Sequence, residues 1–267
     1  MAAFWSSFAE HYGRLFPPRP AAVAWLAGQA PVRPAGTRAL DLGCGAGDDA
    51  AGLAATGLQV LGLDPDPGMV AEARRAHGRV AGLCFEHAGL EDFEPALQGW
   101  LGGRSEPGEV ATDGGELGLA VCVGNVAAHL NLEAIEAFLR RLRPWLAPGG
   151  VLVLQTVNFD RVLARGLGAG RFDLPLLEDA GGEGLPALRF ERRYEDLTEA
   201  GCRFVTRLEA DGARVFEGEV PMTPHCAEAL EGALESAGFG TAERLGGFGE
   251  RPWDPVGAGP TVLRARV

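Results

Sequence analysis

The sequence predicts an α/β protein whose core is a doubly wound, mostly parallel sheet. Two observations carry this prediction. From residue 38 to residue 156, short apolar runs alternate with helical patterns, which is the order that builds parallel strands linked by helices. The chain of 267 residues, 46% of them hydrophobic, is also long enough for one large α/β domain with a small insertion.

The N-terminal half supplies the first helices and strands. Residues 4 to 28 predict two helices that precede and cover the core, separated by the proline-rich break at residues 16–20. Alternating patterns then predict a strand at 39–42, a helix at 48–56, a strand at 59–63, a helix at 67–77 and a strand at 83–87. Residues 101–118 are acidic and rich in turn-forming residues, so they are expected to form a loop.

The sheet is expected to resume at residues 119–123 and to end with a strand at 151–156. A glycine-rich turn at 148–150 precedes that strand. Between them, residues 132–142 predict a helix with an apolar face formed by Ile135, Phe138, Leu139 and Leu142.

After Asp160 the pattern changes to short alternating segments, which predict an antiparallel meander with strands at 191–197, 202–208 and 214–220. A helix at 225–237 and strands at 241–245 and 261–267 then return the chain to the core. The expected organisation is an N-terminal helical cover at 1–36, an α/β core at 37–160, an insertion carrying the meander at 161–222, and a closing helix and hairpin at 223–267.

Composition narrows the classes of partner. The chain has 36 acidic and 24 basic side chains, a net charge of −12. A nucleic-acid partner is not expected, because phosphate binding needs a basic face. No apolar run approaches the ~20 residues of a membrane-spanning helix, and the first residues lack the pattern of a signal peptide. A cytoplasmic protein with no membrane partner is therefore expected.

The five cysteines predict neither a disulfide framework nor a zinc site, because their number is odd and no C-x-x-C pair occurs. No metal site is predicted. The expectation is that all five are buried thiols: Cys44, Cys84, Cys122, Cys202 and Cys226.

The segment from Asp41 to Gly47, Asp-Leu-Gly-Cys-Gly-Ala-Gly, is typical of a turn that approaches a nucleoside, and Asp64 ends the next strand where it could accept bonds from a ribose diol. Asp48 and Asp49 follow the turn, where a pyrophosphate would lie. Carboxylates there disfavour phosphate. The pattern predicts a ligand with a ribose and a positive charge but no phosphate.

Together with Met69-Val70 and the 148–150 turn, these segments resemble class I S-adenosylmethionine-dependent methyltransferases. The resemblance implies S-adenosylmethionine as the cofactor and a seven-stranded, Rossmann-like methyltransferase fold. Where the family has an Asp near the adenine, this chain has Gly89, with Glu91 or Asp92 as substitutes. The expected cofactor-binding residues are Tyr12, Asp41, Gly43, Cys44, Gly45, Asp64, Pro65, Leu90, Val123 and Gly124.

The segment from Gly124 to Leu130 resembles the Gly-Asn-Ser-x-x-His-Leu segment of glycine and sarcosine N-methyltransferases, with Val126 in place of Ser. It implies that Asn125 lies at the reacting corner and that His129 is the candidate general base, needed only if the acceptor binds protonated. The alternative is that His129 caps the next helix or packs in the wall.

Substrate-side residues are expected at Asn158, Arg161 and Tyr194. The glycine methyltransferase group has an Arg for the amino-acid carboxylate where this chain has Val157, so free glycine is not the expected acceptor. Arg161 could take that role, or it could be a solvated surface residue.

The resulting hypothesis is an enzyme that transfers a methyl group from S-adenosylmethionine to a small molecule by in-line displacement, with nitrogen favoured as the acceptor atom. Oxygen and carbon acceptors stay open, and so does a homodimer. The rival from another class is a regulatory protein that binds S-adenosylmethionine or S-adenosylhomocysteine without catalysis. A third reading, an NAD-dependent oxidoreductase, needs phosphate room that Asp48 and Asp49 do not leave.

Overall fold

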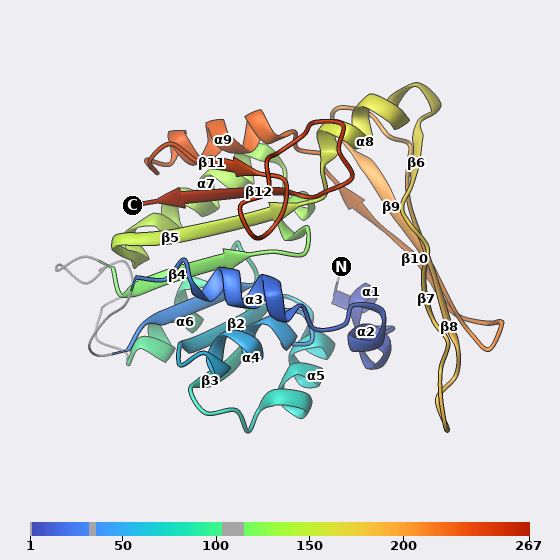
Figure 1. The fold of residues 1–267 in the computed structure, drawn as a ribbon, viewed down its shortest axis with the longest axis horizontal. Coiled ribbons are helices and arrows are strands. Elements are labelled where there is room, and N and C mark those ends of the chain that lie inside the picture. The colour runs from blue at the N-terminus through green and yellow to red at the C-terminus, as the bar shows by residue number, and fades with distance from the viewer. Residues whose placement is uncertain (1, 32–35, 103–114) are drawn as a thin grey trace.

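The computed structural model describes residues 2–31, 36–102 and 115–267. It confirms the predicted fold class: a seven-stranded, mostly parallel sheet lies between two helical layers, and a second, antiparallel sheet stands at one end of it (Figure 1). The strands of the core sheet lie in the order β11 (Glu243–Leu245), β12 (Thr261–Arg266), β5 (Leu146–Thr156), β4 (Leu117–Cys122), β1 (Arg38–Leu42), β2 (Gln59–Asp64) and β3 (Leu83–His87).

The chain builds this sheet outward from its centre. β1 pairs in parallel with β2 on one side and with β4 on the other, so the strand order reverses between β1 and β4. Ligands of such sheets bind at the carboxyl ends of the strands beside this switch point. β12 runs antiparallel to both of its neighbours, β5 and β11, and closes the sheet as predicted.

Helices cover both faces because strand residues alternate between them. Leu40 and Leu42 pack in one hydrophobic cluster and Ala39 in the other. One face is covered by α3 (Pro20–Ala27), α4 (Asp48–Ala55) and α5 (Pro67–His77). The other is covered by α6 (Glu94–Leu101), α7 (Leu132–Leu142) and α9 (Ala227–Ser236).

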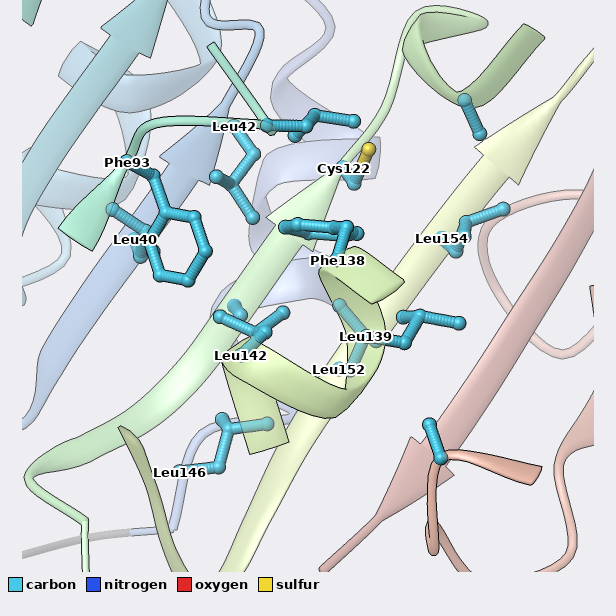
Figure 2. Close-up of a cluster of buried hydrophobic side chains, with 14 of the residues drawn as sticks. Leu40, Leu42, Phe93, Cys122, Phe138, Leu139, Leu142, Leu146, Leu152 and Leu154 are labelled. Carbon is cyan, nitrogen blue, oxygen red and sulfur yellow. The ribbon is translucent and has the colours of Figure 1, made fainter. Parts of the chain in front are cut away.

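The predicted apolar face of α7 is confirmed, since all four of its expected residues are buried. Figure 2 shows Phe138, Leu139 and Leu142 pointing at side chains of β1, β4 and β5. Phe93, which precedes α6, meets Phe138 edge-on with ring centroids 5.8 Å apart. This cluster packs α6 and α7 against one face of the sheet. The carboxyl ends of the strands remain available for a site.

The second sheet lies beyond the ends toward which the parallel core strands point, with α1 (Ala2–Ser6) and α2 (Ala9–Leu15) between the two sheets (Figure 1). A third hydrophobic cluster joins α1 and α2 to this sheet through Phe4, Phe8 and Phe190. The strands of the second sheet are β6 (Arg171–Asp173), β7 (Leu177–Asp179), β8 (Leu188–Glu195), β9 (Cys202–Ala210) and β10 (Ala213–Met222).

The predicted meander is confirmed in β8, β9 and β10, and the structure adds elements the pattern did not show. β6 and β7 are three residues each, too short for a readable alternation. Short helical elements were also missed: α6, α8 (Phe159–Gly166), η1 (Val126–His129), η2 (Arg143–Trp145) and η3 (Leu167–Ala169).

Three boundaries differ from the prediction. The first expected helix is two helices, because the chain turns at Phe8, whose side chain is fully buried. β5 begins at Leu146 and includes the predicted turn at residues 148–150. Most of the expected loop at 101–118 lies outside the described residues, and within it β4 already begins at Leu117.

The prediction of buried thiols is wrong for Cys84, which is exposed because it lies on the outward side of the edge strand β3. Cys122 and Cys202 are buried, and Cys44 and Cys226 are partly buried. Within the described residues, none of the helices is both long and apolar enough to cross a membrane. The same residues contain no group of three or more His, Cys, Asp or Glu side chains that could hold a metal ion.

Candidate cofactor and acceptor site

The glycine turn after β1 is tied to the neighbouring strand. Leu63 O accepts hydrogen bonds from the amides of Gly43 and Cys44, at 2.7 and 2.9 Å. Gly43 has φ +75°, and a Cβ at this position would lie 2.3 Å from Cγ2 of Val126. Only glycine fits both the backbone and the space, so the turn is held close to the carboxyl ends of β1 and β2.

Two cavities open at this edge of the sheet. The larger, about 520 Å³, lies between the glycine turn, the end of β4 and the second sheet. The smaller, about 120 Å³, is a slot beside the ends of β2 and β3. Trp5, Gly43 and His129 line both of them, so the slot and the larger cavity meet at these side chains.

Asp41 is the acid of the glycine motif and lines the larger cavity. It is 1% exposed, and neither of its carboxylate oxygens has a hydrogen-bond partner among the described residues. Burial, with a contribution from Asp49, raises its pKa well above the ordinary value. A buried carboxylate without a partner is costly. The carboxylate therefore suits a cationic group of a ligand in this cavity.

Asp64 ends β2, as predicted, and its carboxylate braces the site. It accepts hydrogen bonds from the amides of Gly45, at 2.9 Å, and Asp66, at 2.8 Å. The alternative role as a helix cap belongs to Asp66, whose side chain accepts from the first amides of α5. A carboxylate can accept about four hydrogen bonds, so Asp64 keeps capacity for ribose hydroxyls.

The slot contains the residues predicted to contact an adenine. The residues that line it include Pro65, Leu90 and Leu42, and also Gly89 and Glu91. The carboxylate of Asp92 is occupied, since it accepts the amide of Gly89 at 2.6 Å. Of the two proposed substitutes for the family's Asp, only Glu91 therefore lines the slot.

Asn125 forms the centre of the corner at the end of β4. It adopts a left-handed backbone with φ 71°, which Asn tolerates better than most residues. Its Oδ1 accepts the amide of Val157 at 3.1 Å, and its Nδ2 lies 3.5 Å from the hydroxyl of Tyr194. Gly124 donates its amide to Oε1 of Gln155 at 2.8 Å. These bonds hold Asn125 rigidly against the second sheet.

His129 packs in the wall between the two cavities. Its ring meets Trp5 edge-on with centroids 5.9 Å apart, and its Nδ1 is buried with no hydrogen-bond partner in the described part of the chain. The alternative of a helix cap is excluded, because Asn131 caps α7 by accepting the amide of Ala134. Burial lowers the pKa of His129 to about 4, so the imidazole is neutral at pH 7 and a weak base.

The acids after the glycine turn line the larger cavity as expected, but both are paired. Asp48 lies 3.2 Å from Nε2 of His77, and Asp49 pairs with Arg19. Tyr12 covers the turn: a Cβ on Gly45 would lie 3.6 Å from its hydroxyl. Burial raises the pKa of Tyr12, so its hydroxyl stays protonated.

Two predicted substrate-side residues do not line either cavity. Asn158 caps α8 and donates its amide to the carbonyls of Asp254 and Gly257, at 2.8 and 3.3 Å, so its role is structural. The guanidinium of Arg161 lies over the ring of Phe172, 5.7 Å from its centroid. Neither side chain therefore lines the two cavities, and their assignment to the acceptor side stays a prediction that this geometry does not support.

The other expected site residues are brought together. Val123, Gly124, Cys44 and Tyr194 line the larger cavity with Asp41, while Gly45 contributes its amide to Asp64. Sequence reasoning missed further lining residues that come from α1, β5 and the second sheet: Trp5, Gln155, Phe190, Arg192, Phe204 and Met222. Gln155 lies at the carboxyl end of β5, a position from which it could have been predicted as a site residue.

Comparison with known proteins agrees with this geometry. Residues 40–152 match the family described as "Methyltransferase domain". A ubiquinone biosynthesis O-methyltransferase of Azorhizobium caulinodans is 29% identical over 46% of this chain and 41% of its own length. A trans-aconitate 2-methyltransferase of Methylobacterium nodulans is 45% identical over 22% of each chain. The chain thus matches less than half the length of each curated relative.

Solved structures extend the similarity over nearly the whole chain. The CcbJ methyltransferase of Streptomyces caelestis has a TM-score of 0.71 at 20% identity and covers 97% of this chain and 96% of its own. An S-adenosylmethionine-dependent methyltransferase of Clostridium acetobutylicum has a TM-score of 0.69 at 14% identity, with 97% of both chains covered. At these identities the comparison shows the fold, including the second sheet, rather than the acceptor.

Proposed function

Since the chain has the class I S-adenosylmethionine-dependent methyltransferase fold and residues 40–152 match its methyltransferase domain, we propose that it methylates a small-molecule acceptor, at nitrogen. The observation that carries the proposal is Asp41. Its buried carboxylate has no partner among the described residues and lines a cavity joined to an apolar slot. This pair of spaces suits a nucleoside with a cationic amino-acid end.

The residues present fit the cofactor at three points. Asp41 provides a carboxyl group, unpartnered among the described residues, for a cationic group, and Pro65 and Leu90 give the slot apolar walls for the base. Asp64 is not among the residues that line either cavity, but its carboxylate keeps acceptor capacity for the ribose beside the amide of Gly45. Asp48 and Asp49 add negative charge beside the turn, which disfavours the pyrophosphate of NAD. When bound, S-adenosylmethionine supplies an electrophilic methyl group.

The chain's own contribution to transfer is positioning. A displacement at carbon needs the nucleophile held in line with the methyl group at roughly 3 Å. The amide of Val157 donates to Oδ1 of Asn125, and Nδ2 of Asn125 lies 3.5 Å from the hydroxyl of Tyr194, so the side-chain amide is oriented without a ligand. Aromatic and aliphatic side chains of the second sheet, among them Phe204 and Met222, line the acceptor side and restrict water there.

The weakness of the local base supports nitrogen as the acceptor atom. A hydroxyl acceptor must lose its proton during attack, and the pKa of His129, about 4, leaves it poorly matched to that task at pH 7. A neutral amine already carries its lone pair and releases a proton to solvent after the new N–C bond has formed. This supports nitrogen, together with the Gly124-Asn125 segment. Among the fold relatives is an aminopentose methyltransferase of Micromonospora echinaspora, with S-adenosylmethionine bound.

The test combines binding and turnover. Calorimetry is expected to show binding of S-adenosylmethionine and S-adenosylhomocysteine and no binding of NAD. Methyl-labelled cofactor should then transfer label to members of a panel of primary and secondary amines. Label on phenols or carboxylic acids instead would move the acceptor to oxygen. Binding without transfer to any class would favour the regulatory reading, and NAD binding alone would contradict the proposal.

A further inference from the structure

Arg192 lines the larger cavity and has no counter-ion among the residues that the structure describes. Its Nη2 donates to the carbonyl of Pro175 at 2.8 Å, while its Nε is buried without a partner. No carboxylate among the described residues forms an ion pair with it, although most of the other arginines there have one. Burial lowers the pKa of its guanidinium, because the charged form loses contact with water.

The surroundings of Arg192 hold the guanidinium in place. It lies over the rings of both Phe16 and Phe190, 5.6 and 5.8 Å from their centroids, and these two rings meet edge-on with centroids 6.1 Å apart. Residues 190, 192 and 194 share one face of β8, and all three line the cavity. Arg192 is therefore part of the cavity wall, and its guanidinium keeps N–H groups beyond the one that bonds Pro175.

The other charges of the cavity do not neutralise Arg192. Asp48 pairs with His77, and Asp49 pairs with Arg19. Asp41 is unpaired but belongs to the glycine turn of the core sheet, whereas Arg192 belongs to the second sheet. Among the described residues, the cavity thus has an unpaired carboxyl group, Asp41, on the core side and an unpaired guanidinium, Arg192, on the side of the second sheet.

We propose that Arg192 binds a carboxylate inside the cavity and that the preferred methyl acceptors are amines that also carry a carboxylate. A guanidinium recognises a carboxylate with two parallel hydrogen bonds, which fits a planar donor that lacks a counter-ion among the described residues. The inference rests on the proposed function. A cationic side chain in the wall of the acceptor cavity selects acceptors that carry a negative charge.

The strand geometry separates this carboxylate from the methylated atom. Tyr194 reaches Asn125 at the reacting corner, and the Cα of Arg192 lies two residues back on β8, roughly 7 Å along the strand. The acceptor's nucleophile is expected at the corner and its carboxylate at the guanidinium of Arg192, beside Phe16 and Phe190. The acid therefore anchors the acceptor and is not itself methylated.

S-adenosylmethionine also carries a carboxylate, on its methionine part, so the experiment has to distinguish the two sources. The first arm uses 3-phenylpropionate and its neutral partner 3-phenylpropionamide as binding probes, measured by ligand-observed NMR on the full chain. The protein is compared with Arg192→Met, with Arg192→Lys, and with Arg189→Gln as a matched control. Arg189 is on the same strand but exposed on the opposite face, paired with Glu178 and Glu191.

The expected result is that the protein binds the acid about 10- to 100-fold more tightly than the amide, and that Arg192→Met removes this preference. Arg192→Lys should keep part of it and Arg189→Gln all of it. Equal binding of acid and amide by the unchanged protein would overturn the proposal. So would an unchanged preference in an Arg192→Met protein with a native melting curve.

The second arm measures the Kd of S-adenosylmethionine and of its decarboxylated analogue. Arg192→Met should change neither by more than about twofold. If it weakens only the carboxylated form while acid binding persists, Arg192 serves the cofactor and the assignment to the acceptor is overturned. Failure of the unchanged protein to bind S-adenosylmethionine would instead contradict the proposed function, and the acid and amide comparison would still report on Arg192 alone.

Discussion

His129 offers a prediction whose size can be worked from its surroundings. Burial between Trp5 and the two cavities lowers the pKa of its imidazole from the ordinary 6.5 to about 4. Between these two values the unfolded chain binds a proton that the folded chain does not. Stability contributed by the neutral ring is therefore present above pH 6.5 and is lost as the pH falls toward 4.

The magnitude follows from the two pKa values. Proton uptake by the unfolded chain at pH 4.5, compared with pH 7, should remove about 2 kcal/mol of unfolding free energy through this one residue. Replacing His129 with Gln removes the titrating group and keeps a polar side chain of comparable length. The variant should therefore lose about 2 kcal/mol less stability than the unchanged protein over this range.

The assay is urea unfolding followed by circular dichroism at several pH values from 7 to 4.5. His87→Gln is the matched control, because His87 is exposed and its replacement should leave the pH profile unchanged. Parallel profiles for the unchanged protein and His129→Gln would refute the reasoning. They would mean that the ring is solvated, and a general-base role for His129 would then return.

Three further predictions concern the turn and the core. Asp64→Ala should weaken S-adenosylmethionine binding by about 1–3 kcal/mol in calorimetry, because it removes both the brace on Gly45 and the expected ribose bonds; wild-type affinity would contradict this. Gly43→Ala should destabilise the fold by about 1–3 kcal/mol, since its Cβ would lie 2.3 Å from Val126; an unchanged melting temperature would exclude the clash. Phe138→Ala should cost about 3–5 kcal/mol in urea unfolding through the cavity it leaves, and a loss below 1 kcal/mol would show that the cluster relaxes.

The positions of the residues proposed to bind the cofactor could be predicted from sequence, because the patterns that place them are local. A buried strand, a glycine turn and an acid at the next strand end are each encoded within a few residues. The parallel pairing of β1 and β2 puts the ends of both strands at one edge of the sheet, and this is where Asp41, Gly43 and Asp64 lie. Pro65 and Leu90 followed, since the carboxyl ends of neighbouring parallel strands share one edge.

The acceptor side could not be read in the same way, because its residues meet only through the packing of the second sheet on the core. In the sequence alone, Arg192 cannot be told from a surface arginine of a meander. The pairing of β8 with β9 determines which face of β8 turns toward the cavity. Asn158 and Arg161 followed a core strand and seemed suitably placed. The short helix α8 instead turns them toward Asp254 and Phe172.

The most direct test of the central claim is a crystal structure of the protein with S-adenosylhomocysteine. The account predicts the adenine in the slot between Pro65 and Leu90, the ribose at Asp64, and the amino-acid end beside Asp41 in the larger cavity. A ligand bound elsewhere, or an Asp41 carboxylate that stays unpartnered with the ligand in place, would contradict it.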